Sequence, residues 1–258
     1  MKAQYFIAAT ACVLLFSSCL TIHQKKIVEA PYVPPVVEGA DQGDIEKVAK
    51  VYFSTEDIPS IDGKFNEWEG LDGVHVRRMV YGGLFDPANT DGYFKLRADS
   101  EYIYLYANVT DNDAAPNAYA ASQAWRGDSI EFFFGTDLMP HTFYKQSDHR
   151  VRIIPKSKTA IYSYDLAIND VSMKNDEIKC AIVFDDNGYT IEARLPFSLM
   201  GIKSLKPKQK VRCDFQINDA DGGKERTRLI HWNSPKDNTY LDASAWGDGV
   251  VVEFPVEQ

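Results

Sequence analysis

The sequence is short of cysteine, of positive charge and of apolar runs long enough to cross a membrane. It contains four cysteines and five histidines, and its 28 Lys and Arg residues are outnumbered by 37 Asp and Glu, which gives a net charge of −9. An acidic chain lacks the basic face that phosphate recognition requires, so we expect no nucleic-acid partner. Cys180 and Cys213 have no histidines near them, which argues against a zinc site.

The longest apolar run lies at the N-terminus and predicts a targeting segment. Lys2 supplies a positive start, residues 3–16 are mostly apolar, and two serines precede Cys19. The run is too short to span a bilayer comfortably. Its Ser-Ser-Cys end resembles the cleavage box of bacterial lipoproteins. The resemblance implies that residues 1–18 are a removed signal peptide and that Cys19 is acylated and anchored to a membrane of the cell envelope; an ordinary secretion signal is the alternative.

The rest of the chain divides into a tether and one domain. Residues 19–46 contain several prolines and glycines without sustained periodicity, which is typical of a flexible tether. Residues 47–258 are enough for one sizeable β domain. They retain Cys180 and Cys213. An exported compartment permits a disulfide between them, and their strand-like surroundings equally favour two buried free thiols.

Short alternating segments with almost no helix predict an antiparallel β-sandwich of about ten or more strands. The clearest is a hairpin with arms at 93–97 and 102–109, and Asn187-Gly188 predicts a second tight turn. Single helical turns are expected at 65–71, with Trp68 pointing inward, and at 197–201. The other expected strands are 48–53, 74–81, 150–154, 160–164, 178–184, 189–195, 210–218, 228–232 and 250–254.

Residues 125–135, WRGDSIEFFFG, are the stretch with the clearest chemistry. Strand side chains alternate, so Glu131 points away from the face of Ile130 and Phe132. An unpaired buried carboxylate is costly, so we expect Glu131 to line a site rather than to lie in a wholly buried strand. Trp125 lies at the strand entrance. An aromatic plate beside a carboxylate suits a sugar ring; the alternative is a half-exposed strand with a surface glutamate.

Seven short motifs follow one another along the globular part of the chain. They are Ile61-Asp62-Gly63 with Trp68, EYIYLYANVTD (101–111), AWRGDSIEFFF (124–134), HRVRI (149–153), GYTIEARLPF (188–197), FQINDAD (215–221) and HWNSPKDNTYLDASAWG (231–247). In this order they resemble the family 9 carbohydrate-binding modules, a branch of the DOMON-like β-sandwiches. Such modules bind sugars without catalysis, often at the end of a glycan chain, by clamping a ring between two aromatic side chains.

The resemblance implies a set of binding residues. Its two clamp positions fall on Trp125 and on Tyr240, where better-known members carry Trp. Arg152 stands where the family pattern can carry Asn, which makes this pocket more basic. A carboxylate, a guanidinium and an amide together donate to and accept from adjacent hydroxyls; the alternative is a cross-strand salt bridge on a solvated sheet face. The implied polar residues are Glu131, Arg150, Arg152, Gln216 and Asp237.

The resemblance also implies a structural calcium ion. Asp111, Asp113 and Asp128 lie at loop ends near the predicted clamp. Calcium favours carboxylate and carbonyl oxygens. Aspartates that cap turns are the alternative.

Three other functions stay open beside non-catalytic binding of an oligosaccharide or polysaccharide. A haem-binding electron-transfer domain would use Met or His, but no such pair stands out on facing strands. A glycosidase would use two carboxylates, but Asp128 and Glu131 are three residues apart on a strand and point to opposite faces. A scaffold with a decayed sugar site, bound to cell-envelope proteins, follows if Tyr240 does not act as a clamp.

Overall fold

The computed structural model describes residues 45–255, all of which belong to one compact unit. The predicted signal peptide, Cys19 and nearly all of the predicted tether therefore lie outside the described residues. Within the described part, no helix is long and apolar enough to cross a membrane. The helical segments of the described residues are short 3-10 helices: η1 (Asn66–Trp68), η2 (Ala121–Arg126), η3 (Phe197–Leu199), η4 (Asp221–Gly223) and η5 (Ala243–Ala245).

Fourteen strands make up nearly all the regular structure of the described residues. In chain order they are β1 (Val48–Phe53), β2 (Val74–His75), β3 (Arg78–Tyr81), β4 (Thr90–Ala98), β5 (Tyr102–Asp111), β6 (Ser129–Gly135), β7 (Asp148–Pro155), β8 (Tyr164–Ile168), β9 (Val171–Ser172), β10 (Lys179–Asp185), β11 (Gly188–Pro196), β12 (Lys210–Asp219), β13 (Arg228–His231) and β14 (Gly247–Glu253). The all-β prediction is confirmed.

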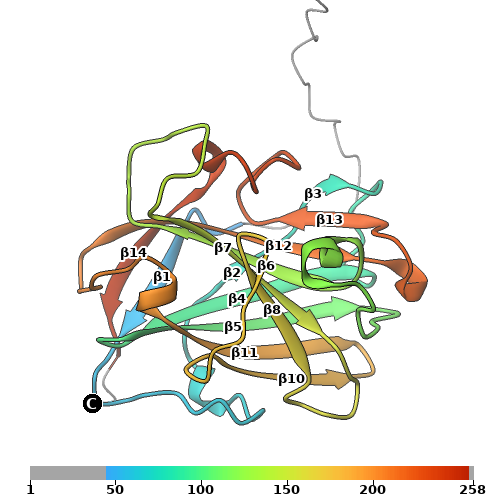
Figure 1. Ribbon diagram of the computed structural model, residues 1–258, viewed down its shortest axis with the longest axis horizontal. Coiled ribbons are helices and arrows are strands. Elements are labelled where there is room, and N and C mark those ends of the chain that lie inside the picture. Colours follow the sequence, from blue (N-terminus) through green and yellow to red (C-terminus); the bar gives the residue numbers. More distant parts are fainter. Residues whose placement is uncertain (1–44, 256–258) are drawn as a thin grey trace, which may run out of the picture. The chain divides into compact units, whose positions relative to one another are not determined.

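The strands form one curled sheet in the order β10-β11-β5-β4-β1-β14-β12-β6-β7-β8-β9. The layer β10, β11, β5 and β4 faces the layer that contains β12, β6 and β7 (Figure 1). Phe94 of β4 meets Phe215 of β12 across the core at 4.9 Å between ring centroids. The sandwich prediction holds, with one difference: β1 pairs in parallel with both β4 and β14, so the sheet is mixed.

Two predicted strands differ from the structure. The predicted strand 74–81 is divided into β2, which pairs with β4, and β3, which pairs with β13. The strand is interrupted because the chain changes its pairing partner from β4 to β13. The prediction at 160–164 is wrong: Ser163 N donates to Ala160 O in a turn, and the strand begins at Tyr164.

All seven residues of β6 are buried, so the expectation that Glu131 could not lie in a wholly buried strand is wrong. Its side chains alternate as predicted: Phe132 lies in the core, whereas Phe133 packs on the other face against Trp246, 5.8 Å away. Segments distant in sequence cover that second face. Burial of Glu131 is possible because arginines from β7 neutralise it.

A segment around the Ile61-Asp62-Gly63 motif lies over the outer face of β11. The Glu192 carboxylate accepts hydrogen bonds from Asp62 N at 2.5 Å, Gly63 N at 2.6 Å and Trp68 Nε1 at 3.4 Å. Trp68 is buried, as predicted. This motif therefore fixes the segment to the sheet, and it lies in the layer opposite the predicted sugar site.

The structure also shows how Glu46 and the two cysteines are held in the domain. Glu46, assigned by sequence to the tether, is held within the domain: its carbonyl accepts from Trp232 Nε1 at 2.6 Å and its carboxylate binds the His75 backbone and ring. Cys180 and Cys213 are both buried free thiols, which confirms the second of the two alternatives for these residues. Burial raises the pKa of both thiols.

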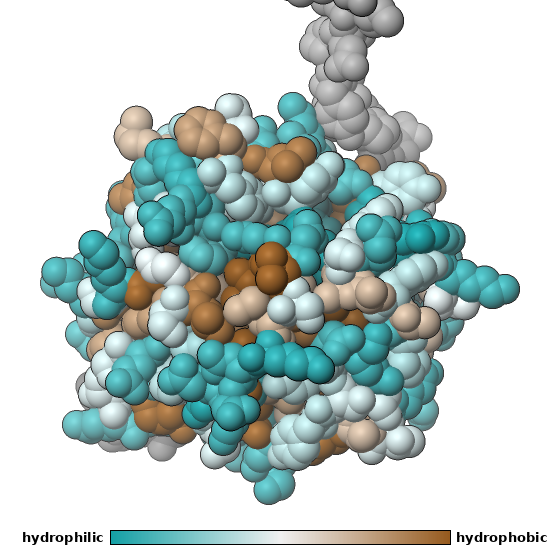
Figure 2. Space-filling view, in the orientation of Figure 1, coloured by the Kyte–Doolittle hydropathy of each residue, from teal (hydrophilic) through white to brown (hydrophobic). Residues whose placement is uncertain are grey.

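Two loops extend beyond the sheets on the side of the second layer, at the top of Figure 1. Residues 136–147 connect β6 to β7, and residues 232–246 connect β13 to β14. Tyr144 Oη donates to Thr239 O at 2.8 Å and so joins the two loops. Figure 2 shows a few tan and brown side chains among teal and white ones at the top of this face.

Candidate functional site

A pocket of about 260 Å³ opens on the outer face of β6, β7 and β12. Its size is close to the lower end of ligand pockets, which span about 300–1,000 Å³. All seven residues that the sequence predicted for sugar binding line it: Trp125, Glu131, Arg150, Arg152, Gln216, Asp237 and Tyr240. Ser122, Asp170 and Arg226, which the sequence did not single out, complete the lining.

Strand register brings the polar residues together. Glu131 of β6 is opposite Arg152 of β7 on one side and opposite Gln216 of β12 on the other. Arg150 lies two residues before Arg152 and so shares its face. The Gln216 amide donates from Nε2 to Asn218 Oδ1 at 2.9 Å. Three neighbouring strands therefore present a continuous polar row to the pocket.

The centre of this row is a buried ion-pair network. Arg152 Nε donates to Glu131 Oε1 at 2.8 Å, and Arg150 Nε lies 3.5 Å from Glu131 Oε2. Only 1% of Glu131 is exposed. Burial opposes ionisation, but the charges of Arg152 and Arg150 outweigh it and hold the pKa of Glu131 below its usual value. The carboxylate is therefore ionised and fixed before any ligand arrives, and the alternative of a solvated surface pair does not apply.

Asp170 is a second acid in the network, and sequence reasoning missed it. It lies 2.5 Å from Arg150 Nη2 and 3.0 Å from Arg152 Nη1. Asn169 and Asp170 both have positive φ, at 49° and 67°, in the tight turn between β8 and β9. Asn and Asp tolerate this conformation better than most residues. The Asn-Asp pair signals a turn, but the direction of the carboxylate depends on the fold.

Arg152 has a supporting position in this pocket. Besides Glu131 and Asp170, its guanidinium donates from Nη1 to Ala121 O at 2.8 Å, at the start of η2. Only 2% of Arg152 is exposed. It joins β6, the Asp170 turn and the helical turn that carries Trp125. Its fixed contacts hold the pocket wall in place.

The two predicted clamp rings come from separate segments. Trp125 belongs to η2, and Tyr240 belongs to the loop 232–246, where 44% of it is exposed. Each ring has a guanidinium near its face: Arg226 lies 5.2 Å from the Trp125 ring and Arg150 lies 5.6 Å from the Tyr240 ring. Such contacts orient the rings through cation–π attraction.

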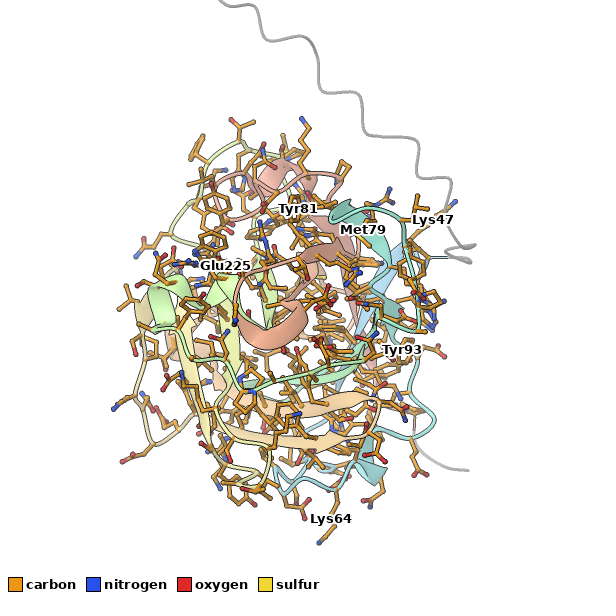
Figure 3. The ribbon with its side chains drawn as sticks, turned by 90° about the vertical axis from the view of Figure 1, so that its right-hand side faces the viewer. Lys47, Lys64, Met79, Tyr81, Tyr93 and Glu225 are labelled. Carbon is orange, nitrogen blue, oxygen red and sulfur yellow. The ribbon has the colours of Figure 1, made fainter. Side chains whose placement is uncertain are left out.

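The loop that carries Arg226 is attached to both sides of the pocket. Arg226 pairs with Asp237 and donates to Asn218 Oδ1 at 3.1 Å. Its neighbour Glu225 pairs with Arg126 of η2. Figure 3 labels Glu225 and Tyr81, and the Tyr81 ring lies 5.8 Å from the Arg226 guanidinium. Arg226 therefore lies near two aromatic rings, an arrangement that no local motif signals.

Buried contacts also fix the loop that carries Tyr240. The Asp214 carboxylate accepts from Asn233 N at 3.0 Å and from Ser234 N at 2.9 Å. At the far end of the loop, Trp246 packs against Tyr144 at 5.4 Å between ring centroids. The position of Tyr240 is thus set by the sheet beneath it.

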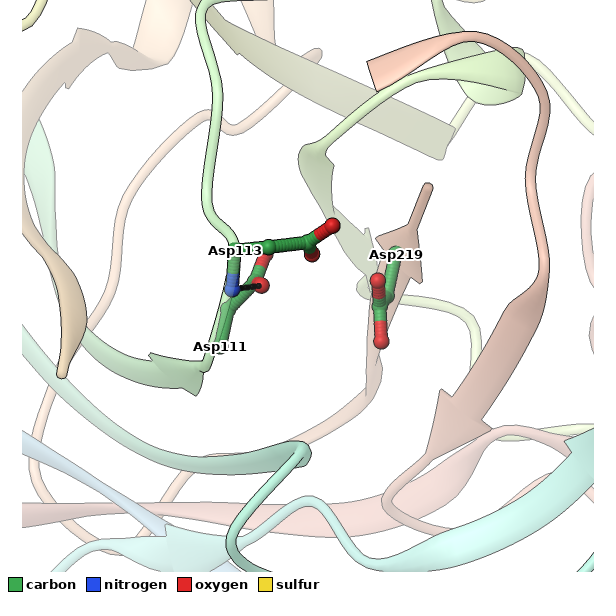
Figure 4. A group of neighbouring side chains, drawn as sticks. All are labelled: Asp111, Asp113 and Asp219. Carbon is green, nitrogen blue, oxygen red and sulfur yellow. Dashed lines mark hydrogen bonds between the residues drawn. The ribbon is translucent and has the colours of Figure 1, made fainter. Parts of the chain in front are cut away.

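Two of the three predicted calcium residues, Asp111 and Asp113, form a cluster with Asp219 outside the sugar pocket. The third predicted residue, Asp128, is not part of this cluster. Carboxylate oxygens of Asp111, Asp113 and Asp219 lie within 4.8 Å of one another (Figure 4). Asp128, the third predicted residue, instead accepts hydrogen bonds from Ala115 N at 2.7 Å and Ala220 N at 2.8 Å. Asp219 ends β12, distant in sequence from the others, so spacing alone did not associate it with them.

The cluster has the properties of a cation site. Burial, and then the charges of Asp128 and Asp219, raise the pKa of Asp111 to about 8. Burial likewise raises the pKa of Asp128 to about 7 and that of Asp219 to about 6. Asp219 Oδ1 and Tyr189 Oη are buried without a hydrogen-bond partner among the described residues. Repelling carboxylates and free buried oxygens fit a hard cation that takes oxygen ligands.

Two histidines outside the sugar pocket, His141 and His75, have carboxylate partners. His141 Nε2 lies 2.6 Å from Asp148 Oδ2, and His75 is held by Glu46. Asp128 and Glu131 face different surroundings, since the backbone amides hold Asp128 and the arginines hold Glu131.

Comparisons with known proteins identify relatives of this chain. The chain is 27% identical over 219 residues to Exoglucanase XynX of Acetivibrio thermocellus, covering 83% of this chain and 18% of that protein. It is 24% identical over 218 residues to Endo-1,4-beta-xylanase A of Thermoanaerobacterium saccharolyticum, covering 83% and 17%. The chain thus matches less than a fifth of the length of these relatives.

A solved structure with a similar fold is the family 9 carbohydrate-binding module from Caldicellulosiruptor kristjanssonii in complex with cellotriose. It has a TM-score of 0.63 and 20% identity, and the match covers 82% of this chain and all of that one. The sequence profile described as "Carbohydrate family 9 binding domain-like" matches residues 61–253. Because that profile covers most of the sequence, the chain belongs to the carbohydrate family 9 binding domain-like family.

Proposed function

We propose that this protein binds carbohydrate without catalysis, with a sugar ring held between Trp125 and Tyr240. The observation that carries the proposal is that all seven residues implied by the sequence line one pocket. Glu131, Arg150 and Gln216 form its floor and supply acceptors and donors for adjacent hydroxyls. Because ion pairs with both arginines already hold Glu131 without a ligand, binding requires little rearrangement of the floor.

The ligand class that the comparisons favour is a β-linked glucan or xylan. The module from Caldicellulosiruptor kristjanssonii has been solved with cellotriose and with glucose, and the relatives named above are an exoglucanase and a xylanase. The pocket charges support a neutral sugar, since Glu131, Asp170 and Asp237 balance Arg150, Arg152 and Arg226.

We also propose that calcium binds among Asp111, Asp113 and Asp219. The unpartnered Asp219 Oδ1 and the raised pKa values support this assignment. Calcium would neutralise the repelling carboxylates and hold the end of β5 against the end of β12, with Asp128 fixing the adjacent loops. The ion is a structural element in this proposal and takes no part in sugar contact.

The N-terminal sequence supports a further proposal, that acylated Cys19 tethers the domain to a bacterial membrane of the cell envelope. The tether would hold the sugar pocket at a distance from the lipid surface. Any cell-envelope protein partner would bind the domain there. Growth of expressing cells with labelled palmitate tests this proposal. Label should enter the wild-type protein and be absent from Cys19→Ala; an unlabelled wild type would contradict it.

Isothermal titration with cellotriose tests the sugar site. We expect micromolar to millimolar affinity, weakened about tenfold or more in Trp125→Ala because an aromatic face loses about 1.5–3 kcal/mol of burial. Tyr162→Ala, which removes an exposed tyrosine outside the pocket, is the matched control and should bind like the wild type. Equal binding by wild type and Trp125→Ala would remove Trp125 from the site.

A further inference from the structure

Tyr81 is an exposed aromatic residue at the edge of the sheet that carries the sugar pocket. It is 54% exposed and ends β3. Strand β3 pairs with β13, and β13 pairs in turn with the pocket strand β12. Figure 3 views this side of the domain and labels Tyr81. The strands beneath the pocket therefore continue as far as Tyr81.

A β-bulge turns Tyr81 away from the core. Met79 of β3 is opposite Ile230 of β13, and both residues belong to the hydrophobic core. Regular alternation would place Tyr81, two residues after Met79, on the same core face. The next pair is Tyr81 with Leu229, so β3 has one extra residue, Val80, between the two pairs. Such a bulge redirects side chains, which explains why Tyr81 is exposed while Met79 is buried.

Strand register shows that Tyr81 is turned to the face that holds the pocket. Leu229 is opposite Tyr81 on one side and opposite Asn218 of β12 on the other. Residues directly opposite one another share a face of the sheet. Asn218 also shares its face with Gln216, which is two residues earlier and lines the pocket. Tyr81 therefore lies on the pocket face, two strands from Gln216.

Arg226 connects Tyr81 to the pocket. It lines the pocket, and its guanidinium lies 5.2 Å from the Trp125 ring and 5.8 Å from the Tyr81 ring. Its Nη1 donates to Asn218 Oδ1 at 3.1 Å, and its Nη2 pairs with Asp237. These contacts use two of the five N–H donors of a guanidinium, so donors remain for a ligand hydroxyl.

An exposed phenol ring beside a guanidinium repeats the chemistry of the pocket itself. Tyr240, which lines the pocket, likewise has the Arg150 guanidinium 5.6 Å from its ring. A sugar gains from an aromatic face that covers its C–H groups and from a donor that binds its hydroxyls. A glycan chain that leaves the pocket past Arg226 would meet Tyr81 next. Continuity with the pocket therefore favours another unit of the same chain as the occupant.

We propose that Tyr81 and Arg226 form a second subsite, which holds the next sugar unit of a chain whose end unit lies between Trp125 and Tyr240. The preferred ligand is then an oligosaccharide or polysaccharide rather than a monosaccharide. This inference rests on the proposed sugar-binding function, because the pocket must hold the end unit before the next unit meets Tyr81.

Isothermal titration with glucose and cellotriose tests the proposal. Glucose fills only the pocket, whereas cellotriose also reaches the second subsite, so the wild type should bind cellotriose more tightly. Tyr81→Ala should weaken cellotriose binding about fivefold through loss of an aromatic contact and leave glucose binding unchanged. Tyr81→Phe keeps the ring and should retain most of the cellotriose affinity. Tyr162→Ala, which removes a similarly exposed tyrosine elsewhere, is the matched control and should bind both sugars like the wild type.

The outcomes separate this inference from the proposed function. Equal cellotriose affinities in the wild type and Tyr81→Ala would overturn the second subsite and leave the pocket function intact. Losses of the same size for glucose and cellotriose in Tyr81→Ala would also overturn it, because Tyr81 would then act by supporting the pocket. A wild type that binds neither sugar would contradict the proposed function and this inference with it.

Discussion

Replacing Glu131 with glutamine should destabilise the protein strongly. The substitution keeps the size of the side chain and removes its charge. Both partner guanidiniums are then left in a site where Arg150 is 5% exposed and Arg152 is 2% exposed. Breaking a buried ion pair costs about 3–5 kcal/mol. Asp170 still contacts both arginines at 2.5 and 3.0 Å, so we expect a loss near the lower end, about 3 kcal/mol.

Urea denaturation at pH 7 measures this loss. Glu225→Gln is the matched control, because Glu225 forms an ion pair with Arg126 and its side chain is 60% exposed. Exposed pairs contribute about 0–1 kcal/mol, so the control should differ from the wild type by less than about 1 kcal/mol. Similar small losses in both variants would refute the conclusion that the Glu131 network is a buried, stability-bearing unit.

The pH dependence of the Glu131 difference follows from its lowered pKa. A carboxyl whose pKa is lower in the folded state contributes stability that is present above its unfolded pKa, about 4.3. That contribution disappears as pH falls through the folded pKa. The stability difference between the wild type and Glu131→Gln should therefore be smallest in acid, grow as pH rises toward about 4.3, and stay constant above that pH. A difference that does not change with pH would contradict an ionised Glu131.

Two further predictions concern the other buried acids. Raised pKa values mean that Asp111 and Asp219 in the folded state hold protons at pH values where the unfolded chain has released them. With a chelator present, the free energy of unfolding should therefore fall as pH rises from about 4 to about 8. Calcium should restore it most at pH 8. Thermal melts with and without calcium test this; a midpoint unmoved by calcium in the wild type, or moved equally in Asp219→Asn, would count against the site. Glu192→Ala should cost about 2–4 kcal/mol, because three donors lose a buried charged acceptor. Urea denaturation measures it, and a cost below about 1 kcal/mol would show that Glu192 does not hold the Trp68 segment.

Alternation along the chain was enough to predict the sandwich and most strands. It could not predict that β1 runs parallel to both neighbours, because pairing direction depends on where the chain returns rather than on local pattern. It also misjudged β6. The strand itself reads as half-polar, and its second face is buried by loops that follow more than 90 residues later, such as the one that carries Trp246.

The residues of the candidate site that lie in recognisable motifs could be predicted from the sequence. Glu131 and Gln216 lie inside strands of clear period two, so their shared face follows from register. Asp170 and Arg226 lie in turns, where side-chain direction is decided by the sheet that the turn contacts. Asp219 was missed for a similar reason: the ends of two distant strands meet there, and Asp128 was nearer in sequence to the other acids.

Tryptophan fluorescence offers the most direct test of the sugar site. Trp68, Trp232 and Trp246 are at most 3% exposed, whereas Trp125 lines the pocket and is partly exposed. A soluble quencher such as acrylamide should therefore act mainly on Trp125. If a sugar ring covers that indole, cellotriose will reduce quenching in a saturable way, and Trp125→Phe will lose the effect. Quenching that is unchanged at saturating cellotriose would contradict the claim that Trp125 stacks on the ligand.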